Sequence, residues 1–126
     1  MSTDARFMVI PVFDGLLAAF AGDGQLLWQR FLPPITSNQF TYGPGHNALA
    51  MTPSGDLTVV GTKSYQLLVY DRTGSLLWSH TATLQAAQTT NAGLPYPGVN
   101  SAAISSDGRY VAGGYRDNVI RIFRRQ

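Results

Sequence analysis

The chain has 126 residues, of which 44% are hydrophobic, so it can bury the core of one domain and disorder is not expected. Charged residues make up only 13%, against about 25% in typical soluble domains, and the formal net charge is +2 with no glutamate. The absence of cysteine excludes disulfides and thiolate metal sites.

In chain order, the sequence predicts ten short β-strands in three groups. Runs of about five to seven residues rich in β-branched, aromatic and leucine side chains are separated by turn sequences such as "PSGD" and "RTG". Glycine in such turns supplies the positive φ that a tight hairpin needs. No segment shows a sustained helical period. The three groups of predicted strands are 6–12, 16–20 and 25–31; 48–52, 57–62, 66–70 and 75–81; 101–105, 109–115 and 119–124.

The three groups are copies of one unit. A shift of 50 residues places "LLAAFAGDGQLLW" on "QLLVYDRTGSLLW", so that Gly24 matches Gly74 and Trp28 matches Trp78. A shift of 53 residues places "PGHNALAMTPSGDLTVVG" on "PGVNSAAISSDGRYVAGG" without a gap. Four antiparallel strands in a repeat of about 50 residues are typical of a propeller blade.

The fold class that follows is all-β, with about three blades of four-stranded antiparallel sheets in one partial β-propeller over 1–126. The blade units span about 6–31, 48–81 and 101–124, and the long connections 31–47 and 81–100 join them. The first unit lacks its innermost strand and the last unit lacks its outermost strand.

Two propeller families share these motifs. "VYDRTGSLLW" resembles the repeat of quinoprotein-type propellers, in which Asp, then Thr-Gly, then Trp close each blade; here these are Asp71, Thr73, Gly74 and Trp78. The second and third units are similar to WD-repeats, which carry Gly-His before the innermost strand, "SPDG" in the first turn, an Asp in the second turn and Trp-Asp at the end of the third strand.

The polar network of the WD-repeat, which joins His, Ser or Thr, Asp and Trp, is incomplete in every unit. The second unit has His46 but Ser64 in the Asp position, and the third has Asp117 but Val99 in the His position. Stability is therefore expected to rest on apolar packing. The residues expected to have structural roles are Trp28, Trp78, Gly24, Gly74, Asp71 and Asp117.

Three incomplete blades cannot close a ring, because closed propellers have about four to eight blades. Both ends would expose apolar faces and strand edges. We therefore expect the chain to be part of a larger or oligomeric ring, completed by a second copy, by partner chains or by further parts of the same polypeptide.

Catalysis is not expected, because the sequence contains no nucleophile triad, phosphate loop or metal-binding motif. The two histidines, His46 and His80, lie at non-equivalent positions. The long connections and the neighbouring second turn offer amide, aromatic and basic side chains suited to recognition. The candidate partner-binding or ligand-binding residues are Asn38, Gln39, Phe40, Tyr42, His46, Asn91, Tyr96, Tyr115 and Arg116.

The leading hypothesis is a non-catalytic protein-interaction or scaffold module that presents a loop-rich propeller face to a protein partner or to further copies of itself. Two alternatives stay open: a lectin-like propeller that binds a small ligand or glycan, and a fragment of a quinoprotein-like or sensory propeller. The cofactor site of quinoprotein enzymes cannot be matched in this chain, so no cofactor or metal is expected and the resemblance implies the fold only.

The chain is expected to be cytoplasmic. Its N-terminus lacks a basic region followed by an apolar stretch, and no apolar run reaches the roughly 18 residues that a membrane span needs. Nucleic-acid binding is not expected either, because Arg121, Arg124 and Arg125 near the C-terminus are not part of a basic stripe interleaved with aromatic residues.

Overall fold

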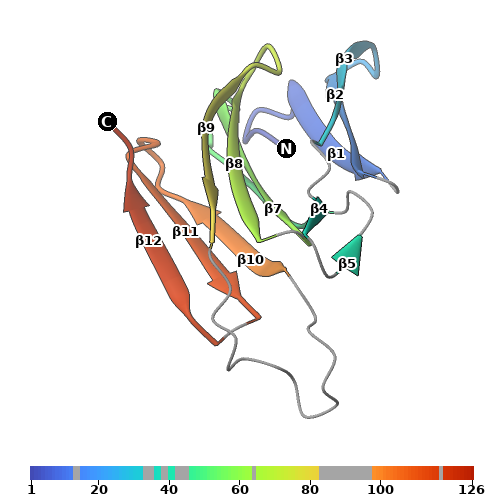
Figure 1. Cartoon of the computed structure of the whole chain (residues 1–126). Coiled ribbons are helices and arrows are strands. Elements are labelled where there is room, and N and C mark those ends of the chain that lie inside the picture. The colour runs from blue at the N-terminus through green and yellow to red at the C-terminus, as the bar shows by residue number, and fades with distance from the viewer. Residues whose placement is uncertain are drawn as a thin grey trace.

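The computed structural model is an all-β structure in which three antiparallel sheets stand side by side (Figure 1). It describes residues 1–12, 15–32, 36–37, 40–41, 46–63, 65–82, 98–116 and 118–126. The strands are β1 (Phe7–Val12), β2 (Leu16–Ala21), β3 (Leu26–Phe31), β4 (Thr36–Ser37), β5 (Phe40–Thr41), β6 (His46–Met51), β7 (Leu57–Thr62), β8 (Gln66–Asp71), β9 (Leu76–Thr81), β10 (Val99–Ile104), β11 (Tyr110–Tyr115) and β12 (Ile120–Arg124).

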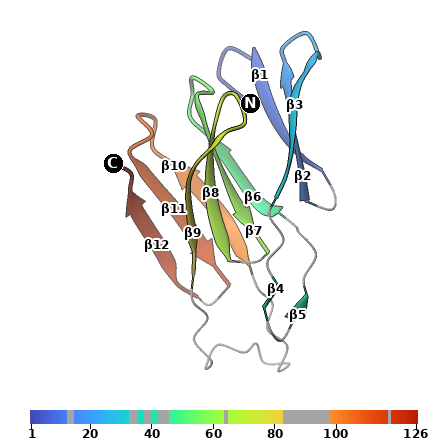
Figure 2. The ribbon, with the colours of Figure 1, turned by 45° about the horizontal axis from the view of Figure 1, so that its top comes forward.

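Each sheet follows the order of the chain. The N-terminal sheet is β1-β2-β3, the middle sheet is β6-β7-β8-β9 and the C-terminal sheet is β10-β11-β12. The ten predicted strands are present, and their ends differ from the expected ones by two residues at most. The described sheets form an open series and do not close a ring (Figure 2).

The connection 31–47, for which the sequence predicts no strand, contains the short strands β4 and β5. Thr36 pairs with Thr41 and Ser37 pairs with Phe40, which makes a separate two-stranded ribbon, β4-β5. Three of the four paired residues are threonine or phenylalanine, which favour extended backbone. Most of the connection 81–100 lies outside the described residues.

The turn between the first and second strand of a unit is built three times in the same way. Residues 2–7, 52–57 and 105–110 each place a Ser or Thr hydroxyl where it accepts the N–H of the residue five positions later, at 2.9–3.1 Å. The fourth residue of each turn has positive φ: Ala5 (56°), Gly55 (77°) and Gly108 (71°). The first unit therefore also contains this turn, whereas the sequence motifs predict it only in the second and third units.

The hydrophobic core has two parts, one on each side of the middle sheet. The first packs the N-terminal sheet on the middle sheet and contains Phe7, Val9, Leu17, Ala19, Trp28, Leu32, Val60, Leu68 and Tyr70. The second packs the C-terminal sheet on the middle sheet and contains Val59, Tyr65, Leu67, Val69, Ala82, Val99, Val111 and Tyr115. Because strand residues alternate in direction, β7 and β8 supply buried side chains to both parts. These two central strands of the middle sheet are therefore buried on both faces.

The two tryptophans both reach from the outermost strand of one sheet to the next sheet. Trp28 of β3 is 8% exposed, and its Nε1–H donates to the carbonyl oxygen of Arg72 at 2.8 Å. Trp78 of β9 is half-buried, and its ring centroid lies 5.1 Å from that of Phe123. Tyr70, which matches Phe123 in the repeat, belongs to the core part that contains Trp28. Both tryptophans thus contact the neighbouring sheet.

Candidate functional site

The outer face of the C-terminal sheet is an exposed apolar surface. Its strands turn Val111 and Tyr115 toward the middle sheet, so the alternate residues point away from it. Cross-strand pairing places Ala112 beside Ile122 and Gly114 beside Ile120. Ile120 is 75% exposed and Ile122 is 69% exposed. We call this surface the C-terminal face; its residues are Ser101, Ala103, Tyr110, Ala112, Gly114, Ile120 and Ile122.

The outer face of the N-terminal sheet is apolar as well. Phe7, Val9 and Leu17 point toward the middle sheet, and the alternate residues pair with one another across β1 and β2. Ile10 is 44% exposed and Val12 is 39% exposed, which leaves apolar side chains open at this end. We call this surface the N-terminal face; its residues are Met8, Ile10, Val12, Leu16, Phe20 and Ala18, which is paired with Ile10 and is itself only 3% exposed.

Both faces have buried counterparts in the middle sheet. In the repeat, Ile120 and Ile122 match Leu67 and Val69, which are fully buried under the C-terminal sheet. On the other side, Ile10, Ala18 and Phe20 match Val60, Leu68 and Tyr70, which are buried under the N-terminal sheet. The terminal faces therefore carry apolar residues at the positions that hold neighbouring sheets together inside the chain.

Phe7 and Leu57, the first residues of β1 and β7, occupy matching positions in the repeat and make the same contact at the two internal interfaces. Phe7 lies against the turn residue Gly55 of the next sheet, where an added Cβ would be 3.2 Å from the Phe7 Cδ1 atom. Leu57 lies against Gly108 in the same way, and there the distance to the Leu57 Cδ1 atom would be 2.5 Å. Tyr110 is the third residue in this series, and it is 48% exposed on the C-terminal face.

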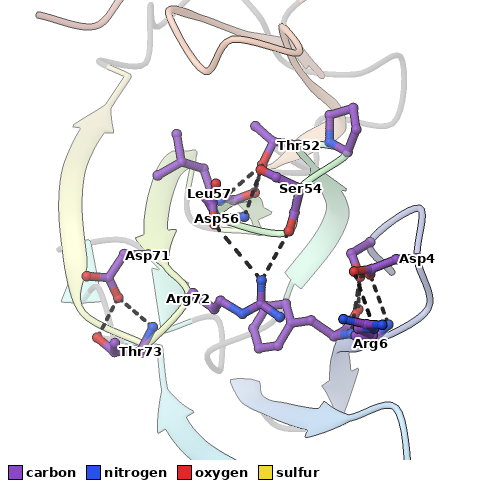
Figure 3. A network of polar contacts seen from close by, with 12 residues as sticks. Asp4, Arg6, Thr52, Ser54, Asp56, Leu57, Asp71, Arg72 and Thr73 are labelled. Carbon is purple, nitrogen blue, oxygen red and sulfur yellow. Dashed lines mark hydrogen bonds and ion pairs between the residues drawn. The ribbon is translucent and has the colours of Figure 1, made fainter.

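Arg72 contacts the turn 52–57 at the interface between the N-terminal sheet and the middle sheet (Figure 3). The Arg72 Nη1 atom donates to the carbonyl oxygen of Ser54 at 3.2 Å and lies 4.0 Å from the Asp56 Oδ1 atom. Its guanidinium carbon also lies 5.0 Å from the ring centroid of Phe7. Arg125, which matches Arg72 in the repeat, donates to the carbonyl oxygen of Gly108 at 2.9 Å. These side chains fix the turn that the preceding sheet packs against.

Most of the predicted loop residues lie outside the described part of the chain. This holds for Asn38, Gln39, Tyr42, Asn91, Tyr96 and the expected turn residue Asp117. Phe40 and His46 lie in β5 and β6, and the structure describes their backbone but not their side chains. Their proposed part in binding stays a prediction.

Tyr115 and Arg116 are the predicted binding residues that the structure does describe. Tyr115 is 4% exposed, and its ring stacks on Tyr65 with centroids 6.5 Å apart. The Arg121 guanidinium carbon lies 4.4 Å from the Tyr115 ring centroid. Arg116 is exposed, and its Nε atom donates to the Asn100 side chain at 2.8 Å. Tyr115 is thus part of the core, and the exposed residue of the pair is Arg116.

The aspartates with the most clearly shifted pKa values belong to turns. In the turn 2–7, the Ser2 hydroxyl donates to Asp4 and lowers the pKa of its carboxyl group. In the turn 105–110, the Ser105 hydroxyl lowers the pKa of Asp107 in the same way. The Thr73 hydroxyl, which donates to Asp71 at 2.7 Å, lowers the pKa of Asp71. These carboxylates accept hydrogen bonds that hold their own turns, which is a structural use.

Tyr70 is buried in the core, and His80 packs against the C-terminal sheet. Burial raises the pKa of Tyr70, and the nearby charge of Arg30 opposes this shift. The His80 ring is half-buried, with its centroid 4.4 Å from that of Phe123. Within the described residues, no group of three or more His, Cys, Asp or Glu side chains is placed to hold a metal ion. In the same part of the chain, no helix is long and apolar enough to cross a membrane.

Comparisons with models of known protein families and with curated proteins found no match to this chain. The sequence predicts exposed apolar faces at both ends of the chain, but it did not lead to a prediction of the residues that form them. The signal was present in the repeat alignment, because each exposed residue on them matches a residue of the middle sheet.

Proposed function

We propose that this chain is a non-catalytic protein-interaction module of propeller-type blades, and that its two terminal sheet faces are its binding surfaces. The observation that carries the proposal is the contrast between the sheets. The middle sheet buries Leu67 and Val69 completely, whereas the matching residues Ile120 and Ile122 are 75% and 69% exposed. Large exposed apolar patches mark interaction surfaces.

The expected partner is a protein that presents a sheet face of similar shape. Among the described residues, the middle sheet packs on the N-terminal sheet on one face and on the C-terminal sheet on the other. Blades that pack face to face in this way are the arrangement of a propeller. The loops that join the blades remain candidates for a second contact, on the grounds of their amide and aromatic residues.

Site-specific photo-crosslinking in cells that express the chain tests the proposal. A photoreactive amino acid replaces Ile122 on the C-terminal face, and in the control it replaces Leu77. Leu77 is 49% exposed on β9, so it is also an apolar surface residue, but it lies on neither terminal face. We expect a protein adduct at position 122 and little or none at position 77. Equal labelling at both positions, or no protein adduct, would contradict the proposal.

A further inference from the structure

We infer that the partner is a second copy of this chain, bound head to tail, with the C-terminal face of each copy packed on the N-terminal face of the other. This inference rests on the proposed function and names the partner. Two copies then form a closed ring of six sheets, joined by two identical interfaces.

The internal interfaces provide the template for this contact. The residues that the N-terminal sheet offers to the middle sheet are Phe7, Val9, Leu17 and Ala19. The matching residues of the middle sheet, Leu57, Val59, Leu67 and Val69, pack toward the C-terminal sheet. The third set in this series is Tyr110, Ala112, Ile120 and Ile122 on the C-terminal face. All of these positions lie on the second and third strands of a unit, which are present in each sheet.

The receiving surface in the template is the opposite face of the next sheet. The middle sheet receives the first set on Val60, Leu68 and Tyr70, and the matching residues of the N-terminal sheet are Ile10, Ala18 and Phe20. The turn residue that meets Phe7 is Gly55, and the matching residue in the first unit is Ala5, which also has positive φ. Tyr110 of one copy should therefore lie against the Ala5 turn of the other copy.

Two copies of the three described blade sheets give a number that fits a closed ring. Closed propellers typically have about four to eight blades. Two copies, each with the three described blade sheets, supply six, which falls inside this range. After one head-to-tail contact, each copy still has one terminal face exposed. Closing the ring covers these two faces as well, which favours the closed form.

The charge distribution favours unlike faces over like faces. Residues 98–126 carry five arginines and two aspartates, whereas residues 1–32 carry three aspartates and two arginines. Pairing two C-terminal faces would bring the arginines of two copies together, and like charges at an interface oppose association. Pairing a C-terminal face with an N-terminal face instead brings the arginine-rich segment 98–126 beside the segment 1–32, whose charged side chains nearly balance.

Light scattering after size-exclusion chromatography of the purified chain tests the inference. We expect the wild-type chain and the control variant Leu77→Asp to have twice the chain mass of 13.6 kDa. Ile122→Asp and Ile10→Asp should each fall to the chain mass, because each removes one partner of both interfaces in a ring of identical copies. Circular dichroism checks that each variant folds, and Ile120→Asp and Val12→Asp provide a second exposed pair for the same comparison.

Mixing the two variants separates head-to-tail from like-face pairing. In an equimolar mixture, the intact C-terminal face of Ile10→Asp can bind the intact N-terminal face of Ile122→Asp, so a two-chain particle should return. It should dissociate at higher concentration than the wild type, because one of its two interfaces is lost. A mixture that stays at the chain mass, or an Ile10→Asp variant that keeps the double mass alone, would overturn the inference.

The inference and the proposed function can fail separately. A wild-type particle at the chain mass across the accessible concentrations would overturn self-closure. If photo-crosslinking at position 122 then attaches a different protein, the module binds that protein and the proposed function stands. If no protein is attached, both are wrong.

Discussion

The indole ring of Trp28 rests on the backbone of Gly74, fifty residues along the repeat from Gly24. A Cβ added at Gly74 would lie 2.8 Å from the Trp28 Cδ2 atom, and the φ of Gly74 is +82°. Any other residue at this position would therefore meet both a strained backbone and a large ring. This close approach seals the first internal interface between sheets, which serves as a template for the proposed contact between copies.

Replacing Gly74 by alanine should destabilise the fold by about 2–4 kcal/mol, from backbone strain and overpacking together. Gly24→Ala is the matched control, because Gly24 has a φ of +88° but no atom within 4 Å of its added Cβ. The control should cost only about 1–2 kcal/mol, the strain part alone. Urea denaturation followed by circular dichroism measures both, and equal losses would contradict the contact.

Trp28→Phe should cost more stability than Trp78→Phe. The first change removes the hydrogen bond to Arg72 and leaves space at a side chain that is only 8% exposed, and we expect a loss of about 1–3 kcal/mol. Trp78 is half-buried, so part of its surface already contacts water. The two unfolding midpoints in urea decide the comparison, and a larger loss for Trp78→Phe would be inconsistent with the packing described above.

The serine hydroxyls that begin the turns 2–7 and 105–110 should contribute to stability according to their burial. Ser2 is 2% exposed and bonds the N–H of the fully buried Phe7, so Ser2→Ala leaves a buried donor unpaired and should cost about 1–3 kcal/mol. Ser105→Ala should cost less, since water can replace the hydroxyl at the exposed Tyr110 N–H. Ser105→Thr should be close to neutral, because Thr52 occupies the matching position. Thermal unfolding of the three variants tests this order.

Acid should weaken the turns. The pKa values of Asp4, Asp71 and Asp107 are lowered below 3.8 in the folded chain, chiefly by serine or threonine hydroxyls. Their stabilising contribution is therefore complete well above pH 3.8, and it is lost as the pH falls through this value and then through the folded pKa values. The free energy of unfolding should decrease between about pH 5 and pH 2. The triple Asp→Asn variant should show a flatter profile in urea titrations, and an unchanged slope would exclude these carboxylates as the cause.

Cysteine cross-linking offers a geometric check on the contact between copies, because the natural chain contains no cysteine. In the double variant Ala5→Cys/Tyr110→Cys, a short bis-maleimide reagent should join two chains in high yield. Each single-cysteine variant should give little product, since a head-to-tail contact does not bring two Ala5 or two Tyr110 positions together. Efficient cross-linking of Tyr110→Cys alone would indicate like-face pairing instead.

The strands and turns could be predicted from the sequence because their signals are local. Apolar runs and turn glycines such as Gly55 and Gly108 mark them directly, and both have the positive φ that was expected. The equivalent turn, residues 2–7, was not predicted because Ala5 stands where the other two turns have glycine. Its Ser2 and Asp4 nevertheless match Ser105 and Asp107.

The surfaces were harder to predict because burial depends on neighbours in space. Ile122 on the C-terminal face and Val69 in the core follow the same alternating pattern, yet one is 69% exposed and the other is fully buried. Tyr115 was predicted to be a binding residue at the second turn of its unit, but it stacks on Tyr65, contacts Arg121 and is buried. No local pattern distinguishes these cases.

The mass of the wild-type particle, measured by sedimentation velocity over a range of concentrations, tests the central claim most directly. Closure of the terminal faces by a second copy predicts a species at twice 13.6 kDa that dissociates only on dilution. A single species at 13.6 kDa at every concentration would contradict the claim.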